Sequence, residues 1–252
     1  MAPKWAVKYE RKPGRWVFEP TLAFRAIGTE IDAAIKKAWH PPSYFFHLRK
    51  GGHVAALKHH TGKTYFSRFD IEDFFGRVNR SRVTRCLKEY FSYAEARKMA
   101  LDSTVHHPTA ARWVLPYGFI QSPILASLAL SKSRLGSTLD HLNKQPGIGV
   151  SVYVDDIIVS ADDGAQIATI CEELTHAARK SGLAFSAAKC QGPDKRITAF
   201  NIELVHGNLA IVDERLAEFA AVLDASASEP QRRGILGYVQ SVNAKQAVEL
   251  IA

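Results

Sequence analysis

The sequence has few cysteines and no long apolar run. Its three cysteines in 252 residues, Cys86, Cys171 and Cys190, lie too far apart for a zinc motif or a disulfide framework. No stretch approaches the roughly 18–20 uncharged apolar residues that cross a membrane, and the first residues lack the apolar segment of a signal peptide. These absences predict a protein of a reducing, cytoplasmic setting that makes no membrane contact.

Acidic residues are scarce in the first quarter of the chain. Residues 1–68 contain 13 Lys and Arg but only 4 Asp and Glu, whereas residues 69–252 contain 20 and 21. The whole excess behind the net charge of +8 therefore precedes residue 69. Such an asymmetry indicates a phosphate-binding N-terminal part attached to a body with a different task. A basic, solvated surface without a ligand is the alternative.

Strand-like and helix-like segments mix without strict alternation, which predicts an α+β fold. Residues 1–20 are basic and aromatic, include Pro13 and Pro20, and suggest an irregular arm. Two short apolar runs around Gly51-Gly52 predict a β-hairpin, and residues 122–142 predict one long helix. A capping box of Ser92 and Glu95 predicts the start of a further helix. The other expected helices cover residues 21–38, 81–90, 165–180 and the last 40 residues. The other expected strands cover residues 64–71, 149–154, 157–160 and 197–212.

Three aspartates stand at the ends of predicted apolar strands. Asp70 ends one strand, and Asp155 and Asp156 join two others. Neighbouring carboxylates in an apolar hairpin repel one another and lose hydration, which a folded protein tolerates where cations compensate. Mg²⁺ prefers such oxygen ligands, and two ions about 3.5–4 Å apart stabilise an in-line phosphoryl displacement. The pattern predicts a two-metal site, with a plain polar turn at Asp155-Asp156 as the alternative.

Five short motifs follow one another along the chain. They are residues 69–75 (FDIEDFF), 115–123 (LPYGFIQSP), 153–156 (YVDD), 182–189 (GLAFSAAK) and 197–201 (ITAFN). In order and spacing, with 85 residues from Asp70 to Asp155, they resemble the palm motifs of reverse transcriptases. The resemblance is greatest to the bacterial retron, group II intron and phage-defence types, and it covers about residues 44–245.

The resemblance implies a right-hand polymerase in minimal form. Its palm would be an antiparallel sheet backed by helices, with abbreviated fingers and a short helical thumb. Residues 1–68 would form the basic N-terminal arm and fingers, and residues 69–212 the palm, with residual fingers helices at about 79–114. Residues 213–252 would form the thumb, which leaves no room for a ribonuclease H, endonuclease or maturase domain.

The resemblance also implies the chemistry of the site. Asp70, Asp155 and Asp156 would be catalytic and, with the Ile71 carbonyl, would bind two Mg²⁺ ions, for which Mn²⁺ could substitute. The primer 3′-hydroxyl would attack the α-phosphorus of a deoxynucleoside triphosphate, so that catalysis consists mostly of positioning and charge neutralisation.

Eleven further positions acquire roles through the same resemblance. Phe75 would exclude a 2′-hydroxyl, and Gly118 would let the backbone approach the nascent base pair. Tyr117 stands where the family commonly has Gln, whose amide a tyrosine cannot imitate. Core packing or surface exposure is the alternative reading for these positions. Nucleotide contacts are implied for Phe75, Tyr117, Gly118, Lys189, Arg49, Lys50 and Lys58, and primer or template contacts for Phe200, Asn201, Arg77 and Arg80.

The leading hypothesis is an RNA-directed DNA polymerase. It would copy a partner non-coding RNA into DNA within a retron or antiphage-defence system, with a protein partner or a second copy of the chain. We expect Lys4, Lys8, Arg11 and Lys12 to bind RNA. A template-independent or protein-primed polymerase on the same palm is one alternative, motivated by Tyr117 and the short fingers. A non-catalytic nucleic-acid-binding protein is the other.

Two histidine pairs lie outside these motifs. His59-His60 and His106-His107 are not at metal-ligand spacing with any cysteine. We therefore expect all four side chains on the surface.

Overall fold

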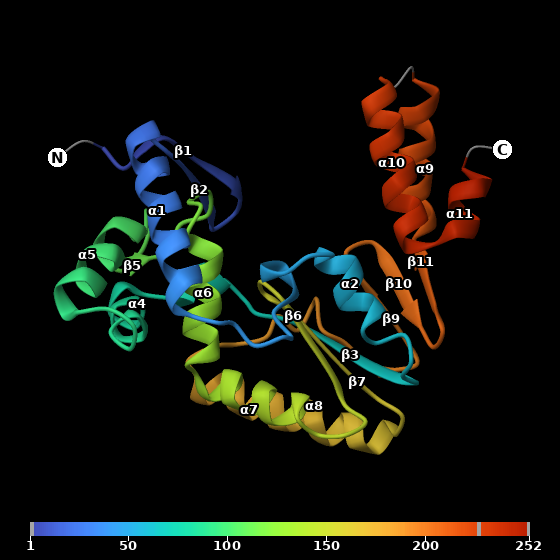
Figure 1. The fold of residues 1–252 in the computed structure, drawn as a ribbon. Coiled ribbons are helices and arrows are strands. Elements are labelled where there is room, and N and C mark those ends of the chain that lie inside the picture. Colours follow the sequence, from blue (N-terminus) through green and yellow to red (C-terminus); the bar gives the residue numbers. More distant parts are fainter. Residues whose placement is uncertain (1–2, 226–227, 251–252) are drawn as a thin grey trace.

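The computed structural model describes residues 3–225 and 228–250 and shows an α+β fold in three parts (Figure 1). An N-terminal part of a hairpin and helices lies at one end, a sheet backed by helices lies in the middle, and a group of helices stands at the other end. The expected α+β class, with antiparallel sheets backed by helices, is confirmed. In the described ranges, no helix is both long enough and apolar enough to cross a membrane.

The chain begins with a β-hairpin, so the expected irregular arm at residues 1–20 is wrong. Strands β1 (Trp5–Lys12) and β2 (Arg15–Pro20) pair antiparallel. Pro13 and Gly14 form the turn, and Gly14 has a φ of +77°, which a glycine adopts without strain. The arm looked irregular in sequence because β1 is exposed along almost its whole length, so no buried face marks it.

Helices support this hairpin. The capping box predicted at the start of α5 is confirmed, because Ser92 accepts from the Glu95 N–H and Glu95 accepts from the Ser92 N–H. Under the hairpin, Phe18 joins Val105 and Val114 in a small apolar cluster. The elements of this part are α1 (Leu22–Ala38), α3 (Phe74–Arg77), α4 (Arg80–Leu87), α5 (Tyr93–Ser103), β4 (Val105–His106) and β5 (Trp113–Val114).

A 3₁₀ turn and a short helix replace the hairpin expected around Gly51-Gly52. These elements are η1 (Phe46–Leu48) and α2 (Gly52–Lys58), with Gly51 at the N-cap in the left-handed region, φ +92°. The apolar residues of the expected second strand, Ala56 and Leu57, are buried on the helix instead. An apolar run of four residues fits either element, so periodicity alone could not decide between them.

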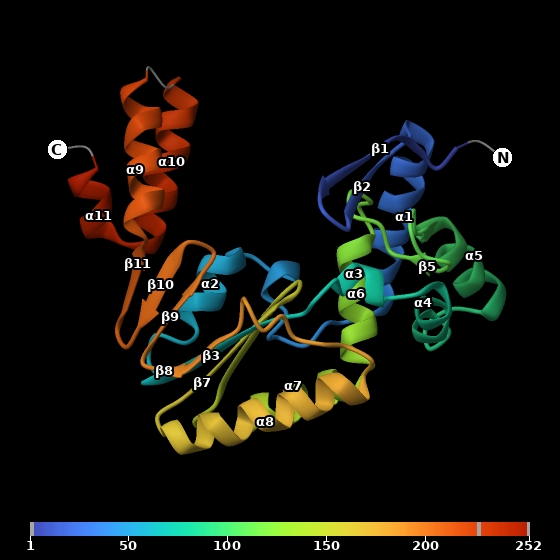
Figure 2. The same cartoon turned by 180° about the vertical axis from the view of Figure 1, so that it is seen from behind.

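A four-stranded antiparallel sheet forms the middle of the molecule. Its order is β6-β7-β3-β8, and α7 and α8 lie side by side under one face (Figures 1 and 2). Its register pairs Asp70 on β3 with Asp156 on β7. The elements are β3 (Tyr65–Asp70), β6 (Gly149–Tyr153), β7 (Asp156–Ala161), β8 (Gln191–Asp194), α7 (Arg134–Asn143) and α8 (Gly164–Lys180).

The single helix expected at residues 122–142 is two helices, α6 (Ser122–Ser131) and α7. Ser133 caps α7 by accepting from the Gly136 N–H at 3.2 Å. A Cβ on Gly136 would lie 2.2 Å from the Leu130 carbonyl oxygen, so only glycine allows the two helix ends to approach this closely. The apolar pattern runs through the break because both helices bury a face in the same core.

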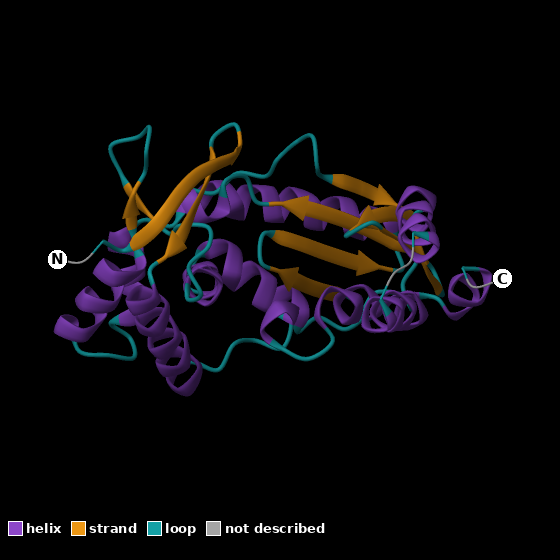
Figure 3. Ribbon diagram, turned by 90° about the horizontal axis from the view of Figure 1, so that it is seen from above, coloured by secondary structure: helices purple, strands orange, loops and turns teal. Residues whose placement is uncertain are grey.

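A second small sheet leads to the C-terminal helices, seen from above in Figure 3. The hairpin expected within residues 197–212 and the helical end are confirmed for the described residues, while residues 226–227 and 251–252 lie outside them. One apolar cluster joins Phe66 and Ile158 of the central sheet to Phe219 and Val239 of the helices. The elements are β9 (Arg196–Ala199), β10 (Ile202–Val205), β11 (Asn208–Ile211), α9 (Asp213–Asp224), α10 (Glu229–Val242) and α11 (Ala244–Glu249).

His60 is fully buried, which corrects the expectation that it lies on the surface. Its ring nitrogens lie 2.7 Å from the Ser160 hydroxyl and 2.8 Å from the Ser151 hydroxyl. Burial lowers the pKa of His60 to about 3, so the ring is neutral and ties β6 and β7 to the end of α2. His59 and His106 are exposed, as expected, and His107 is half-buried.

Candidate active site

Asp70, Asp155 and Asp156 meet at one end of the central sheet. Asp70 ends β3 and lies opposite Asp156, the first residue of β7. The Ile71 N–H donates to the Asp155 carbonyl at 2.9 Å and so continues the ladder past the strand end. Residues directly opposite on antiparallel strands have their Cβ atoms about 4.5–5.5 Å apart. The fold therefore gathers the three aspartates that the sequence singled out.

A tight turn carries Asp155 between β6 and β7. Tyr153 pairs with Asp156 across it, and Val154 adopts a φ of +60°. This left-handed region is unfavourable for a β-branched residue. The Val154 N–H donates to His47 Nδ1 at 3.1 Å. The turn is thus strained and is held by a side chain from another part of the chain.

Burial and like charge act together on Asp155. Burial is the largest cause that raises its pKa, to about 6, and Asp156 and Asp70 add repulsion. Burial also raises the pKa of Asp156, against the opposing charge of Arg68. Arg68 Nη2 and Nε lie 2.7 and 2.8 Å from Asp156 Oδ1. The site therefore holds more negative charge than its own cations neutralise.

Lys189 pairs with Asp70. Its Nζ lies 2.9 Å from both carboxylate oxygens, and its side chain is half-exposed while that of Asp70 is buried. Lys189 reaches Asp70 because the segment after α8 runs along β3, where the Ser186 N–H donates to the Asp70 carbonyl. The predicted approach of Lys189 to the site is thus seen in space, while its role in nucleotide binding stays a prediction.

The donor set fits divalent metal ions. In residues 3–225 and 228–250, no three His, Cys, Asp or Glu side chains stand together as a ready metal site, since Lys189 and Arg68 hold Asp70 and Asp156. Carboxylate oxygens are nevertheless the ligands that Mg²⁺ and Mn²⁺ prefer. Added positive charge would relieve the repulsion that raises the pKa of Asp155. Asp70, Asp155 and Asp156 could therefore hold such ions once Lys189 turns away.

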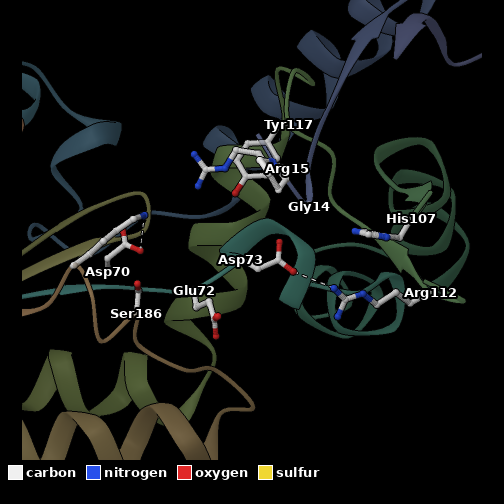
Figure 4. Close-up of a pocket in the computed structure, with 11 residues that line it drawn as sticks. Gly14, Arg15, Asp70, Glu72, Asp73, His107, Arg112, Tyr117 and Ser186 are labelled. Carbon is white, nitrogen blue, oxygen red and sulfur yellow. Dashed lines mark hydrogen bonds and ion pairs between the residues drawn. The ribbon is translucent and has the colours of Figure 1, made fainter. Parts of the chain in front are cut away.

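A cavity of about 460 Å³ opens beside Asp70 (Figure 4). Three cations line it, namely Arg15, Arg112 and Lys189. Arg112 Nη2 lies 3.0 Å from Asp73 Oδ2, a contact drawn in Figure 4. Asp70, Glu72 and Asp73 line it as well, so a cavity of this size and mixed charge suits a polyanionic small molecule that carries its own metal cations.

Arg15 is, besides Arg112, a cation of the site that the sequence did not reveal. It comes from the β1–β2 hairpin, and its guanidinium carbon lies 5.0 Å from the centre of the Tyr117 ring. The Phe18 N–H donates to the Tyr117 carbonyl at 2.9 Å, so the hairpin is docked on the second motif. The Pro13-Gly14 dipeptide between two alternating segments was the signal that could have revealed this hairpin.

Tyr117 lines the cavity, with Gly118 next to it in the chain and the Phe75 ring packed against it. The rings of Phe75 and Tyr117 are 4.7 Å apart, and burial raises the pKa of Tyr117. Gly118 has a φ of +101°, and a Cβ there would lie 2.3 Å from the Phe18 carbonyl oxygen. Glycine at this position is therefore already required by the docking of the hairpin, in addition to any role toward a base pair.

Arg49, Lys50 and Lys58 are not among the described residues that line this cavity. All three are exposed, and Arg49 donates to the Ser43 carbonyl and lies over the Phe46 ring. Their expected contact with a triphosphate stays a prediction, and the structure offers Arg15 and Arg112 in their place.

Phe200 and Asn201 form the β9–β10 turn, both with positive φ. They line a second cavity, of about 420 Å³, together with Tyr238 of α10. The Phe200 ring lies 5.2 Å from that of Tyr153, directly before the turn that carries Asp155. The expected primer contact thus faces the C-terminal helices and stays a prediction.

Arg77 and Arg80, also expected to contact primer or template, make contacts within the protein. Arg77 pairs with Glu72 at 3.5 Å. Arg80 stacks over the Trp113 ring at 3.6 Å and donates to the Thr104 hydroxyl at 2.8 Å. Arg80 therefore has a sufficient structural reason to be present, and its contact with nucleic acid stays a prediction.

The family model described as "Reverse transcriptase (RNA-dependent DNA polymerase)" matches residues 11–203. The Gag-Pol polyprotein of avian reticuloendotheliosis virus is 27% identical over 129 residues, which cover 49% of this chain and 11% of that protein. An uncharacterized protein of Caenorhabditis elegans is 26% identical over 239 residues, 93% and 16% of the respective lengths. The chain thus spans a small part of the length of these curated relatives.

Solved structures share the fold. A foamy viral protease-reverse transcriptase in complex with double-stranded DNA has a TM-score of 0.50 and 18% identity, covering 91% of this chain and 34% of that chain. Telomerase from Candida albicans, in complex with a telomeric RNA fragment, has a TM-score of 0.54 and 10% identity, covering 90% and 47%. These likenesses confirm the expected fold class.

Proposed function

The chain belongs to the reverse transcriptase (RNA-dependent DNA polymerase) family, and from this premise we propose that it is an RNA-directed DNA polymerase. One observation carries the proposal: Asp70, Asp155 and Asp156 converge at a sheet end beside a cavity lined by Arg15, Arg112 and Lys189. This arrangement matches a metal-bound triphosphate, because the carboxylates would bind the metal ions and the cations would bind the phosphates.

We assign the three aspartates, with the Ile71 carbonyl, to two Mg²⁺ ions, with Mn²⁺ as a substitute. The ions would supply Lewis-acid stabilisation of the attacking and leaving oxygens. Asp155 would gain most from a bound cation, because burial, with added repulsion from Asp156 and Asp70, raises its pKa to about 6. Arg68 would keep Asp156 turned toward β3 through its two bonds to Oδ1.

The cations of the cavity would orient the triphosphate. Two of these cations line the cavity from different parts of the chain. They are Lys189, once it is released from Asp70, and Arg15 on the docked hairpin. Arg112 is held by Asp73 at its rim. Charge-assisted hydrogen bonds to phosphate oxygens are stronger than neutral ones, and Arg offers them in a fixed fork. Positioning of this kind is the main contribution that a protein makes to phosphoryl transfer.

Phe75 and Tyr117 would receive the nucleoside. Tyr117 lines the cavity, and the tilted ring of Phe75, which is 7% exposed and held in place by the core, packs against it. A fixed ring under the sugar would exclude a 2′-hydroxyl and so favour deoxynucleotides. Gly118 would let the backbone lie close to the base pair that forms there.

We propose the division of the chain that the sequence predicted, and we add a role for the β1–β2 hairpin. Residues 1–68 would be fingers, 69–212 palm and 213–252 thumb, with the β1–β2 hairpin as the part of the fingers that reaches the nucleotide. The cavity of Phe200 and Asn201, between the small sheet and α10, would receive the primer. The partners would then be an RNA template, a DNA product and deoxynucleoside triphosphates. Three further expectations rest on the motif resemblance alone and stay predictions: that the RNA is non-coding, that the system is a retron or a defence system, and that a protein partner or a second copy of the chain takes part.

The docked hairpin bears on the template-independent alternative. That alternative was motivated by short fingers and by Tyr117, yet the hairpin covers Tyr117 and places Arg15 against its ring. If the hairpin belongs to the fingers as proposed, they would be less reduced than the sequence indicated, and this supports templated synthesis.

Single-nucleotide extension tests this proposal. A primer annealed to RNA is incubated with Mg²⁺ and one deoxynucleoside triphosphate at a time, and a parallel set omits the RNA. We expect extension only with the nucleotide that complements the next template base. Extension by any nucleotide without RNA would instead support the template-independent polymerase, and no extension by any nucleotide would support the non-catalytic binding protein.

A further inference from the structure

His47 connects two of the five motifs through hydrogen bonds. Its Nδ1 lies 3.1 Å from the Val154 nitrogen in the turn that carries Asp155. Its Nε2 lies 2.7 Å from the Ser127 hydroxyl on α6. Ser127 in turn donates to the carbonyl of Pro123, which belongs to the second motif. The chain of bonds thus runs from the start of α6 to the catalytic turn.

The directions of these bonds define the tautomer of His47. The Val154 N–H can only donate, so Nδ1 must be the acceptor and carry no proton. The Ser127 hydroxyl gives its own proton to the Pro123 carbonyl, so it accepts from the Nε2–H. These two bonds together place the single proton of the neutral His47 ring on Nε2. Burial lowers the pKa of His47 to about 4, so the ring is neutral at neutral pH, as this arrangement requires.

The bond to His47 falls on the most strained residue of the turn. Val154 has a φ of +60°, where its branched side chain crowds the backbone. Such strain persists only where surrounding contacts hold it. The His47 ring is itself fixed at right angles to its neighbours, 5.9 Å from the Phe45 ring and 5.8 Å from the Tyr153 ring. The fixed ring of His47 therefore accepts a hydrogen bond from the backbone N–H of the strained residue Val154.

We propose that His47 is a positioning residue, whose unprotonated Nδ1 holds the Val154 backbone in the left-handed conformation that places Asp155 at the site. The inference rests on the proposed function for its catalytic consequence. The His47 ring bonds to the Val154 N–H and to Ser127, the Val152 backbone lies beside it, and it does not line the nucleotide cavity. Its effect on the site would therefore pass through β6 and the turn.

Two variants separate the hydrogen bond from the packing. His47→Phe keeps an aromatic ring between Phe45 and Tyr153 but removes the acceptor, whereas His47→Asn places an amide oxygen near the position of Nδ1. His59→Phe is the matched control, because His59 is an exposed residue outside the turn. The first readout is hydrogen exchange of the Val154 amide by NMR on the full chain, which needs no substrate and no metal.

We expect the Val154 amide to exchange at least about tenfold faster in His47→Phe, with partial recovery in His47→Asn and no change in His59→Phe. Primer extension by His47→Phe should lose about tenfold in kcat with little change in KM, because nucleotide binding is untouched. In a Val154→Gly background, where the left-handed conformation costs nothing, the same change should lose less than about threefold.

Unchanged Val154 exchange in His47→Phe would overturn the inference, whatever the extension assay gives. Equal losses of kcat in the wild-type and Val154→Gly backgrounds would overturn it as well, since a general loss of stability predicts equal losses. A wild-type protein that makes no polymer would overturn the proposed function instead, and the exchange result would still decide whether His47 holds the turn.

Discussion

Lys189 holds the carboxylate of Asp70 with its Nζ 2.9 Å from both oxygens. A cation thus occupies the position from which a metal ion would bind Asp70. The lysine is half-exposed and the aspartate buried, so only the lysine can move away without unfolding the sheet. If a metal ion binds Asp70 as proposed, it would compete with the Lys189 ammonium for one carboxylate.

Removing this ammonium should therefore tighten metal binding. We expect Lys189→Met to lower the apparent Kd for Mn²⁺ by about 3–10-fold, the equivalent of about 0.7–1.4 kcal/mol for a partly exposed ion pair. Titration followed by electron paramagnetic resonance measures it. Lys195→Met, at an exposed residue over the Tyr65 ring, is the control and should leave the Kd unchanged. Weaker binding in Lys189→Met would show that the lysine supports the metal site instead.

Asp155 should make the metal-free protein less stable as pH rises. Its pKa is about 6 when folded, against an ordinary value of 3.8, so between these values the folded state keeps a proton that the unfolded chain has lost. The free energy of unfolding therefore falls from about pH 4 to pH 6. Asp155→Asn should remove this slope and be about 1–3 kcal/mol more stable than the wild type at pH 7.5.

Urea unfolding in the presence of a chelator, at intervals from pH 4 to pH 8, measures this effect. Asp162→Asn serves as the control, because Asp162 is exposed and bonded to Lys63, and it should show no such gain. Parallel pH curves for the wild type and Asp155→Asn would show that burial and the neighbouring carboxylates do not raise the pKa of Asp155.

Gly118 should tolerate no side chain. In Gly118→Ala the Cβ would meet the Phe18 backbone carbonyl at 2.3 Å, and backbone atoms cannot turn aside as a side chain can. Gly147→Ala is a matched control, with a similar φ of +85° but open space around it. We expect Gly147→Ala to cost about 1 kcal/mol and Gly118→Ala at least about 2 kcal/mol more. Equal costs, measured by urea unfolding, would mean that the hairpin is not docked on Tyr117.

The N-terminal charges should divide into two groups. Lys8, Arg11 and Lys12 are exposed on β1 and free to meet phosphates. Lys4 instead donates to the carbonyls of Leu101 and Thr104, and burial lowers its pKa, so we now expect it to support the fold. Replacing the first three with Gln should weaken RNA binding and reduce the salt slope, log Kd against log salt concentration, by about 2.

Fluorescence anisotropy with a labelled single-stranded RNA, over a range of salt concentrations, checks this prediction. Replacing Lys144, Arg179 and Lys180 removes the same charge from the ends of α7 and α8, under the central sheet and away from the hairpin (Figure 1). That control should keep the wild-type slope. If both triple variants lose the same slope, the binding follows net charge and not the hairpin.

The parts of the molecule that local sequence determines were predictable. Asp70, Asp155 and Asp156 each stand at the edge of a short apolar strand, and capping residues such as Ser92 mark helix starts within a few positions. The order of the motifs indicated that the three aspartates belong together, and in the structure they lie in one site. Prediction succeeded where the signal lies within about ten residues.

Contacts between distant segments were not predictable in the same way. Arg112 meets Asp73, and Arg15 meets Tyr117, only after the hairpin and β5 have packed against the rest. Burial on both sides of the 131–133 break hid the boundary between α6 and α7, since an apolar pattern continues through it. Strand β1 was missed for the opposite reason, because its alternating apolar side chains, such as Val7 and Tyr9, are exposed among basic residues and not buried in the core.

Primer extension by the wild type and by Asp155→Asn, on a heteropolymeric RNA with all four deoxynucleoside triphosphates and Mg²⁺, tests the central claim most directly. We predict a DNA product complementary to the RNA from the wild type, and at least about a thousandfold lower rate from Asp155→Asn although that variant is folded and stable. Equal synthesis by the two proteins, or a product unrelated to the template, would contradict it.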